Sequence, residues 1–276
     1  MRDPRLTAAN GRVAHVSLEN AVTSERFVEG RLMRVNRAIA DLWRDAQSGP
    51  RQRQLLFGEG FLVLENVGER AFGVSQRDGY AGYVAREMLG SSFEPTHFVS
   101  NLSTHCYRVP DLKAADTMEL SFGSRVRVVG QTGGFVELAG GGFLPGQHVR
   151  RLDDPLDDPA GVAEQFLGVP YLWGGNSSRG VDCSGLVQAA LLSCGIVCPG
   201  DSDLQEAALG TELGGGKSQR RGDLLFWKGH VAMALDHEML IHANAQDMAV
   251  AREPTEQAVA RIVAQGGGPV TSRRRL

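Results

Sequence analysis

The chain of 276 residues has only 4 Cys and contains no apolar run near the ~18 residues that a membrane-spanning helix needs. So few cysteines, unevenly spaced, exclude the disulfide framework of a small secreted protein and favour free thiols in a reducing compartment. Residues 1–10 carry charge and a proline where a signal peptide would have an apolar segment. The sequence therefore predicts a cytoplasmic protein with no membrane partner.

The sequence also lacks a large excess of one charge. There are 29 Lys and Arg against 32 Asp and Glu, a net charge of −3, so nothing indicates a nucleic-acid partner. Glycine, in contrast, is abundant at 35 residues. It follows no three-residue period, which excludes collagen. In a chain of globular composition, this much glycine indicates many turns and favours short strands over long helices.

Two series of short strand patterns, separated by turn residues, precede residue 152. The first includes 61–65, 71–74 and 80–84, and the second includes 126–129 and 134–138. Strands at such close, regular intervals are typical of small antiparallel barrels or sandwiches. A single larger β domain is the alternative.

Both series resemble bacterial SH3-like modules, at residues 36–92 and 93–152. The most specific part of this resemblance is DGYAGYV at 78–84. Residues 1–35 alternate only weakly between apolar and polar, so the sequence predicts an N-terminal arm there and no role for it.

A polar, proline-bearing break at 153–159 predicts a linker to a different kind of domain. Residues 160–167 predict a short amphipathic helix, and the continuously apolar 183–194 predicts a buried one that ends at Gly195. Strand patterns follow at 223–227, 230–235 and 239–242. A helical part followed by a sheet predicts an α+β domain over residues 153–276.

Cys183 is the first residue of the predicted buried helix. A helix N-terminus carries partial positive charge and unpaired N–H groups, which favour a thiolate over a thiol. Asp182 directly precedes it and is suited to cap the helix, because its carboxylate can accept from the first-turn amides. These features predict that Cys183 is a nucleophile.

Two histidines lie on a predicted hairpin downstream. If residues 236–238 form a three-residue turn, His230 and His242 share one face as diagonal neighbours; a two-residue turn would separate them. On the first reading, His230 deprotonates Cys183 and His242 orients the ring of His230. A zinc site at these three residues is the alternative, but zinc sites usually contain closely spaced ligand pairs. The sequence therefore predicts no metal and no cofactor.

Five motifs from this region resemble, in order and spacing, the NlpC-type cell-wall cysteine peptidases, a papain-like α+β family. They are FLGVPYLWGG (166–175), VDCSGLV (181–187), RGDLLFW (221–227), GHV (229–231) and IHA (241–243). With two SH3-like modules ahead of them, the chain is similar to the γ-D-glutamyl-L-diamino acid endopeptidases of murein peptide recycling.

The resemblance implies roles for individual residues. Cys183 would attack the γ-D-glutamyl carbonyl, and Tyr171 would help the Cys183 backbone N–H to hold the oxyanion. Asp182 and Ser184 would bind the free amino group of the substrate's N-terminal L-Ala. An aromatic residue of the first SH3-like module would complete this pocket. Tyr80 matches that position best, with Tyr83 in reserve.

The resemblance therefore implies a papain-like peptidase that cleaves the bond between γ-D-Glu and the diamino acid in free murein peptides. Such a peptide is the expected binding partner of the protein. A secreted hydrolase of intact wall and a non-catalytic wall-peptide-binding protein are the alternatives. Residues 252–276 match nothing in the family pattern, so no role is predicted for them, and no oligomeric state is predicted.

Overall fold

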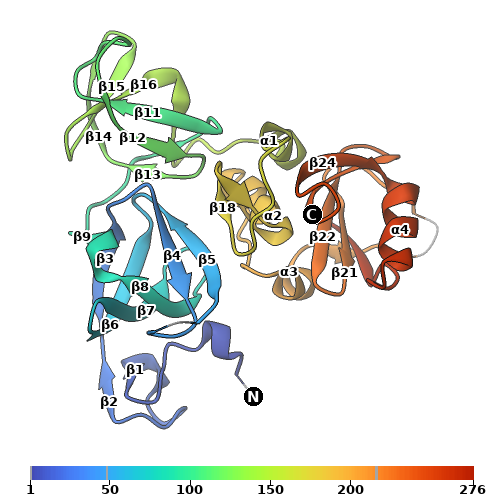
Figure 1. The fold of residues 1–276 in the computed structure, drawn as a ribbon, viewed down its shortest axis with the longest axis horizontal. Coiled ribbons are helices and arrows are strands. Elements are labelled where there is room, and N and C mark those ends of the chain that lie inside the picture. Colours follow the sequence, from blue (N-terminus) through green and yellow to red (C-terminus); the bar gives the residue numbers. More distant parts are fainter. Residues whose placement is uncertain (1, 48, 215–216) are drawn as a thin grey trace. The chain divides into compact units, whose positions relative to one another are not determined.

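The computed structural model describes residues 2–47, 49–214 and 217–276, and the chain forms two compact units, Met1–Leu152 and Asp153–Leu276 (Figure 1). Most of the first unit is β structure, whereas the second combines helices with a sheet. Within these described ranges, no helix is long and apolar enough to cross a membrane.

The first unit begins its main sheet earlier than the predicted module boundary at residue 36. This seven-stranded sheet has the order β5-β4-β8-β7-β6-β3-β9. Its strands are β3 (Arg31–Val35), β4 (Ile39–Trp43), β5 (Arg51–Leu56), β6 (Gly60–Val67), β7 (Arg70–Ser75), β8 (Ala81–Ala85) and β9 (Leu89–Gly90), with a short 3-10 helix, η3 (Arg86–Met88), before β9. The early start arises because β3 pairs with both β6 and β9, and because Val35 is completely buried.

The residues before β3 are more ordered than an extended arm. They form η1 (Pro4–Leu6), β1 (Val13–His15), η2 (Val16–Leu18) and β2 (Arg26–Val28), and β1 and β2 pair in parallel. Val13 is fully buried in a cluster with Phe72 and Tyr83. This segment is therefore packed against the seven-stranded sheet through a few apolar contacts, which its weak sequence pattern did not reveal.

The rest of the first unit contains two smaller antiparallel sheets, with orders β13-β10-β17 and β12-β11-β16-β15-β14. Their elements are β10 (His97–Val99), β11 (Ser103–Tyr107), β12 (Asp116–Ser121), β13 (Arg125–Val126), β14 (Val128–Thr132), β15 (Phe135–Leu138), β16 (Phe143–Pro145), η4 (Gly146–His148) and β17 (Val149–Arg151). Val99, Leu120 and Leu144 are completely buried and form the centre of a separate apolar core.

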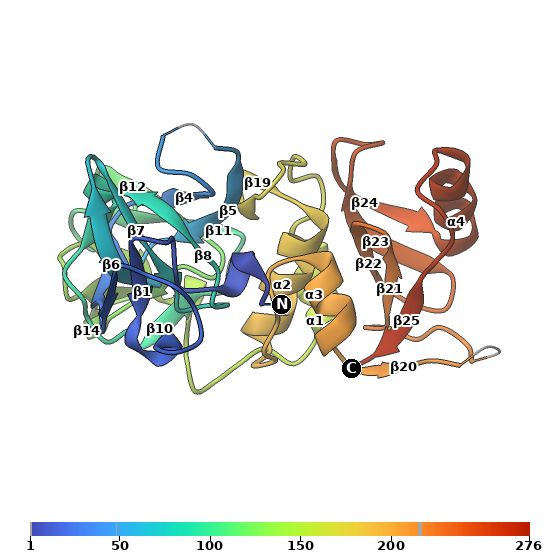
Figure 2. The same cartoon turned by 90° about the horizontal axis from the view of Figure 1, so that it is seen from below.

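The second unit has a six-stranded antiparallel sheet of order β20-β25-β21-β22-β23-β24. Its strands are β20 (Thr211–Glu212), β21 (Leu224–Trp227), β22 (His230–Ala234), β23 (Met239–Asn244), β24 (Ala249–Pro254) and β25 (Ser272–Arg275). Helices α1 (Pro159–Gln165), α2 (Cys183–Ser193) and α3 (Ser202–Ala208) lie on one side of it and α4 (Thr255–Ala264) on the other (Figure 2). A small hairpin of β18 (Asn176–Ser177) and β19 (Gly180–Val181) precedes α2. This α+β arrangement is the papain-like fold that the sequence predicted.

The predicted helices at 160–167 and 183–194 correspond to α1 and α2. The C-terminal stretch, for which no role was predicted, supplies α4 and β25. Helix α4 buries Ala258 and Ile262, one turn apart, against an apolar cluster that includes Leu225, Trp227 and Leu240. These contacts fix one face of the sheet, while α2 packs on the other and brings Cys183 to the sheet.

Candidate active site

The N-terminus of α2 is capped by Asp182, as predicted. One carboxylate oxygen of Asp182 accepts hydrogen bonds from the Gly185 N–H at 2.6 Å and from the Ser184 hydroxyl at 3.0 Å. The other oxygen accepts from the Gly174 N–H at 2.9 Å. The same carboxylate therefore fixes the first turn of α2 and ties it to the loop that contains Tyr171.

The glycine at 185 is required by a close approach of two backbone segments. A Cβ atom at Gly185 would collide with the carbonyl oxygen of Gly175. Gly185 therefore lets the first turn of α2 lie directly against the Gly174–Gly175 turn, and this contact positions the reactive end of the helix.

Cys183 is the first residue of α2. Its side chain is buried where α2 packs against the start of β22. The backbone N–H groups of Val231, Ser184 and Cys183 itself face its sulfur and favour the thiolate. Burial has the larger effect and, with the nearby charge of Asp182, raises the pKa of the Cys183 thiol to about 12. The helix terminus favours the thiolate, as predicted, but burial outweighs it, so the thiol needs a base to react.

The two histidines lie together on the β22–β23 hairpin. Met233 pairs with Ile241 and Ala234 with Leu240, so residues 236–238 form the predicted three-residue turn. As this register requires, Nε2 of His230 lies 3.0 Å from Nδ1 of His242. The predicted placement on one face is confirmed.

His230 is placed to act as the base. It immediately precedes Val231, whose N–H faces the Cys183 sulfur, and its Nε2 is occupied by His242, which leaves Nδ1 for the thiol. Burial, followed by the effects of His242 and Arg261, lowers the pKa of His230 to about 3. A neutral imidazole is the form that can accept a proton. The thiol and the imidazole are therefore both uncharged at neutral pH.

The structure adds a carboxylate that the sequence analysis missed. Glu253 on β24 places Oε2 at 3.1 Å from Nε2 of His242 and is itself held by Arg261 of α4, with Nη2 donating at 2.6 Å and Nε at 2.9 Å. Glu253 pairs with Leu240, which shares a strand face with His242. Side chains alternate between the two faces of β24, and this alternation was the available signal for Glu253. It indicates a residue near His242 only when the β23–β24 register is known.

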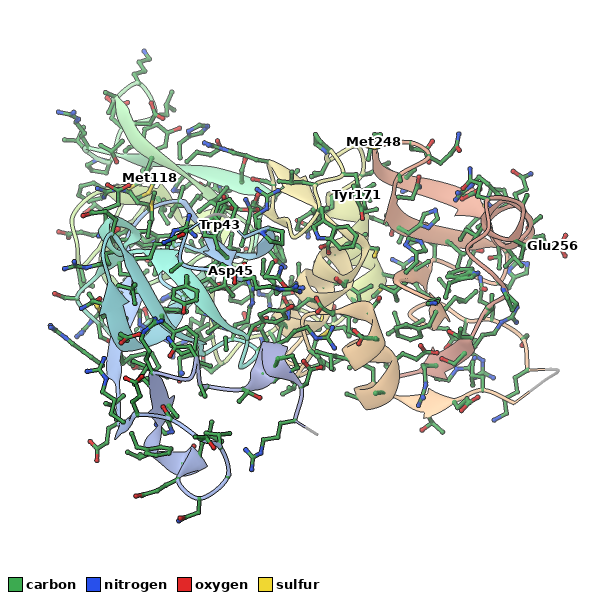
Figure 3. The ribbon with its side chains drawn as sticks, turned by 60° about the horizontal axis from the view of Figure 1, so that its bottom comes forward. Trp43, Asp45, Met118, Tyr171, Met248 and Glu256 are labelled. Atoms are coloured by element: carbon green, nitrogen blue, oxygen red, sulfur yellow. The ribbon has the colours of Figure 1, made fainter. Side chains whose placement is uncertain are left out.

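Tyr171 lies in the loop before α2, and its N–H donates to the carbonyl oxygen of Met248 at 2.8 Å (Figure 3). Burial, and then the nearby Cys183 and Asp182, raise the pKa of its hydroxyl. At neutral pH the hydroxyl is therefore a hydrogen-bond donor beside the thiol. This is the property that the predicted oxyanion role requires, and the role itself stays a prediction.

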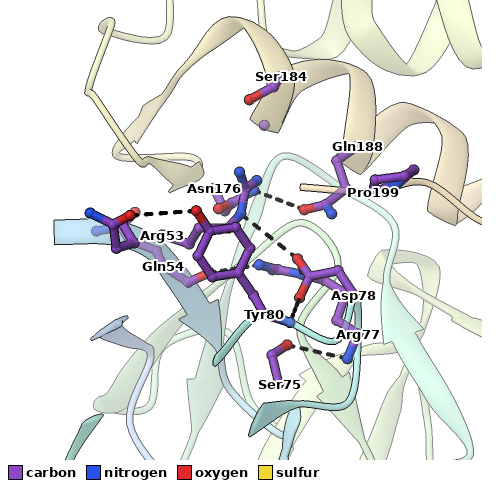
Figure 4. Close-up of polar contacts among 12 residues, drawn as sticks. Arg53, Gln54, Ser75, Arg77, Asp78, Tyr80, Asn176, Ser184, Gln188 and Pro199 are labelled. Carbon is purple, nitrogen blue, oxygen red and sulfur yellow. Dashed lines mark hydrogen bonds and ion pairs between the residues drawn. The ribbon is translucent and has the colours of Figure 1, made fainter. Parts of the chain in front are cut away.

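The residues predicted for the amine pocket lie in both units. Asp182 and Ser184 are at the start of α2, hydrogen-bonded to each other. Tyr80 belongs to the first unit, where it is buried in the core of the seven-stranded sheet and its N–H donates to Asp78 at 3.2 Å (Figure 4). Tyr83, the reserve candidate, accepts a hydrogen bond from Asn10 at 3.2 Å. The joint role of these residues stays a prediction.

The alternative to a catalytic site was zinc held by Cys183, His230 and His242, which requires the three side chains to be arranged around one metal position. Across the residues that the structure describes, no group of three or more His, Cys, Asp or Glu side chains is arranged to hold a metal ion. His230 and His242 instead direct ring nitrogens at each other.

Models of two protein families match most of the second unit and part of the first. The model of the NlpC/P60 family matches residues 168–265, and that of the bacterial dipeptidyl-peptidase Sh3 domain matches residues 42–89. The gamma-D-glutamyl-L-lysine dipeptidyl-peptidase of Bacillus subtilis is 30% identical over 219 residues, which are 71% of this chain and 71% of the relative. Dipeptidyl-peptidase 6 of Lysinibacillus sphaericus is 39% identical over 83 residues, 30% of each chain.

A solved structure shows the same fold over most of the chain. The NlpC/P60 family protein from Bacillus cereus ATCC 10987 aligns with a TM-score of 0.75 at 21% identity, covering 89% of this chain and 99% of that one.

Proposed function

The chain belongs to the NlpC/P60 family of cysteine peptidases, and on this premise we propose that it hydrolyses the bond between γ-D-Glu and the diamino acid of free murein peptides that begin with L-Ala. The observation that carries this proposal is the placement of Cys183 at the capped end of α2, where its sulfur faces the N–H of Val231, the residue after His230, and His230 contacts His242. The name of the Bacillus subtilis relative supports a γ-D-glutamyl substrate, and the match to a dipeptidyl-peptidase Sh3 domain supports release of a dipeptide.

The chemistry follows from these groups. The Cys183 thiol gives its proton to Nδ1 of His230 as the sulfur attacks the γ-carbonyl carbon. The oxyanion that forms accepts hydrogen bonds from the Cys183 N–H and the Tyr171 hydroxyl. His230 then gives the proton to the departing amine of the diamino acid, which leaves a thioester on Cys183. Water, deprotonated by His230, attacks the thioester and releases L-Ala-γ-D-Glu and the free thiol.

Recognition of the substrate's free amino group is the second part of the proposal. Asp182 supplies a carboxylate and Ser184 a hydroxyl, which suit an ammonium group. The Asp182 oxygens already accept from Gly185, Ser184 and Gly174, so the amine would share them. This pocket would restrict the enzyme to peptides with a free N-terminus.

We also propose a cytoplasmic setting in which the substrates are released wall peptides. All four cysteines are free thiols, the state that a reducing compartment maintains. A hydrolase of intact wall outside the cell is the main alternative, and localisation of the tagged native protein separates the two.

Mass-spectrometric cleavage mapping tests the proposal. Wild-type protein and the Cys183→Ala variant are incubated with L-Ala-γ-D-Glu-diaminopimelate, with the corresponding lysine peptide, and with N-acetylated forms of both. We expect L-Ala-γ-D-Glu from the free peptides with the wild type alone. Equal turnover by Cys183→Ala would contradict the peptidase mechanism, and equal turnover of the acetylated peptides would contradict the amine pocket.

A further inference from the structure

A continuous line of polar contacts runs away from the active site, across β22, β23, β24 and α4. Nε2 of His230 contacts Nδ1 of His242 at 3.0 Å, and Nε2 of His242 contacts Glu253 at 3.1 Å. Arg261 is the last residue of the line. Its Nε donates to Oε1 of Glu253 and its Nη2 donates to Oε2. His242 is fully buried, so its ring cannot exchange these partners for water.

The hydrogen-bond pattern assigns a tautomer to each ring. A carboxylate held by Arg261 can only accept, so Nε2 of His242 must carry a proton. Burial lowers the pKa of His242, so the ring is neutral and its Nδ1 is an acceptor. The proton in the contact between His242 and His230 must then lie on Nε2 of His230, which donates to Nδ1 of His242. As a result Nδ1 of His230 is unprotonated, which is the form that can receive the thiol proton.

We propose that Glu253, held by Arg261, is a positioning residue that selects these tautomers and stabilises the His230 imidazolium formed during the reaction. This inference rests on the roles of Cys183 and His230 in the proposed function. The step is a single proton transfer, in which the S–H bond of Cys183 breaks and an N–H bond forms at Nδ1 of His230. The positive charge that appears on His230 is attracted to Glu253 through the neutral ring of His242.

Arg261 has a definite part in this arrangement. Its guanidinium lowers the pKa of Glu253, which keeps the carboxylate ionised, and it also opposes the effect of Glu253 on His242. With Glu253 alone, His242 would bind a proton more readily, and a protonated His242 has no acceptor for His230. Arg261 therefore helps to keep His242 neutral between His230 and Glu253.

The charged and titratable groups around this line come from four elements. His242 faces His230 on β22, Glu253 on β24, Arg261 on α4, and Asp247 in the turn between β23 and β24. The thiol itself faces Asp182 and Tyr171, which stay unchanged in the variants below. A change in pH dependence on altering Glu253 can therefore be assigned to the histidine line.

The test compares Glu253→Gln with Glu164→Gln in the full chain. Glu164 on α1 is likewise a carboxylate held by arginine, here by Arg221 at 2.8 Å and Arg252 at 2.7 Å, and it belongs to a separate ion-pair cluster. The readout is the rate at which iodoacetamide alkylates Cys183, followed by mass spectrometry of its peptide between pH 6 and pH 11. It needs no substrate, so it remains valid if the proposed specificity is wrong.

For Glu253→Gln we expect alkylation at pH 6–7 to fall about tenfold, the equivalent of one pKa unit, and the difference from the wild type to shrink as the pH rises toward the thiol pKa of about 12. The convergence is expected because a thiolate formed by hydroxide no longer needs an imidazolium partner. Unchanged alkylation at pH 6–7, or a uniform fall at every pH, would overturn the proposal. Glu164→Gln should follow the wild-type profile throughout, and an equal effect there would also overturn it.

Glu253→Asp provides a second variant that keeps the charge. It should recover part of the loss at pH 6–7 seen with Glu253→Gln, and identical profiles for the two variants would count against the proposal. Turnover of the free tripeptide is measured in parallel, with the loss expected in kcat rather than KM, since Glu253 acts through two histidines. If the wild type cleaves no murein peptide while the alkylation profiles behave as expected, the substrate assignment fails and the role of Glu253 stands.

Discussion

Nε2 of His230 lies 3.0 Å from Nδ1 of His242, although the residues are 12 positions apart in the chain. This contact is a consequence of the three-residue turn between β22 and β23, which places both side chains on one face of the sheet. It commits one nitrogen of His230 to His242 and leaves the other for Cys183. His230, the proposed base, therefore has a defined orientation before any substrate binds.

Replacing His242 with Ala should remove this orientation. We expect kcat on the free tripeptide to fall by about 10²-fold or more, with little change in KM, because a positioned base contributes to the reaction step. His237→Ala is the control, since His237 is exposed on the turn of the same hairpin. A His242→Ala variant that folds and retains the wild-type kcat would contradict the orienting role.

The stability of the protein should fall as the pH falls below about 6.5. His230 has a pKa of about 3 in the folded protein, whereas an unfolded histidine titrates near 6.5. Between these values the unfolded chain binds more protons, so protonation favours unfolding. His242 acts in the same direction. Calorimetric Tm values from pH 7 down to pH 4 measure this loss.

The His230→Ala variant provides the matching control for that experiment. Its Tm should depend less steeply on pH than that of the wild type, because one buried neutral imidazole is gone. His237→Ala should keep the wild-type slope. Equal slopes for His230→Ala and the wild type would show that His230 does not contribute to the acid sensitivity.

Replacing Gly185 with Ala should destabilise the start of α2. The added methyl would meet the Gly175 carbonyl oxygen, and overpacking of this kind typically costs about 1–3 kcal/mol. We expect a lower Tm and reduced activity, because the same contact positions Cys183. Gly134→Ala is the control, since that glycine has open space around its Cβ position and no positive φ. An unchanged Tm for Gly185→Ala would contradict the close approach.

Asp182→Asn should raise the alkylation rate of Cys183 and lower kcat/KM for free tripeptides. Loss of the charge removes one of the factors that raise the pKa of Cys183, so alkylation of Cys183 at neutral pH should increase. At the same time kcat/KM for free tripeptides should fall, because the proposed amine pocket loses its carboxylate. Cys194 of the same protein, alkylated in parallel, is the internal control. A decrease in both quantities would point to a general loss of structure instead.

Part of this site could be predicted from local patterns. Three features depend only on neighbours within a few residues, where propensity and alternation are informative. They are the cap formed by Asp182, the helix that begins at Cys183, and the hairpin with two histidines. The sequence left two-residue and three-residue turns open, and the register of β22 and β23 confirmed the three-residue turn that was predicted.

Other parts could not be predicted because long-range contacts overrule the local signal. Strand β25 contains Ser272 and three arginines, a composition unlike that of an inner strand. It is nevertheless paired on both sides, and Arg275 forms an ion pair with the buried Asp223 at 2.7 Å. Helix α3 likewise has few apolar positions. Helix α4 does have apolar residues at helical spacing, and the burial of Ala258 and Ile262 holds it on the sheet, but this pattern was not used in the prediction.

The sequence by itself thus determined the family, the α+β fold and the candidates Cys183, His230 and His242, because the motifs that carry them are short and local. The tertiary structure decided the environment of those residues. Burial outweighs the effect of the helix terminus and makes the thiol and the imidazole uncharged. The β23–β24 register adds Glu253, and α4 adds Arg261, since a hydrogen-bonded line across four elements exists only once the sheet has formed.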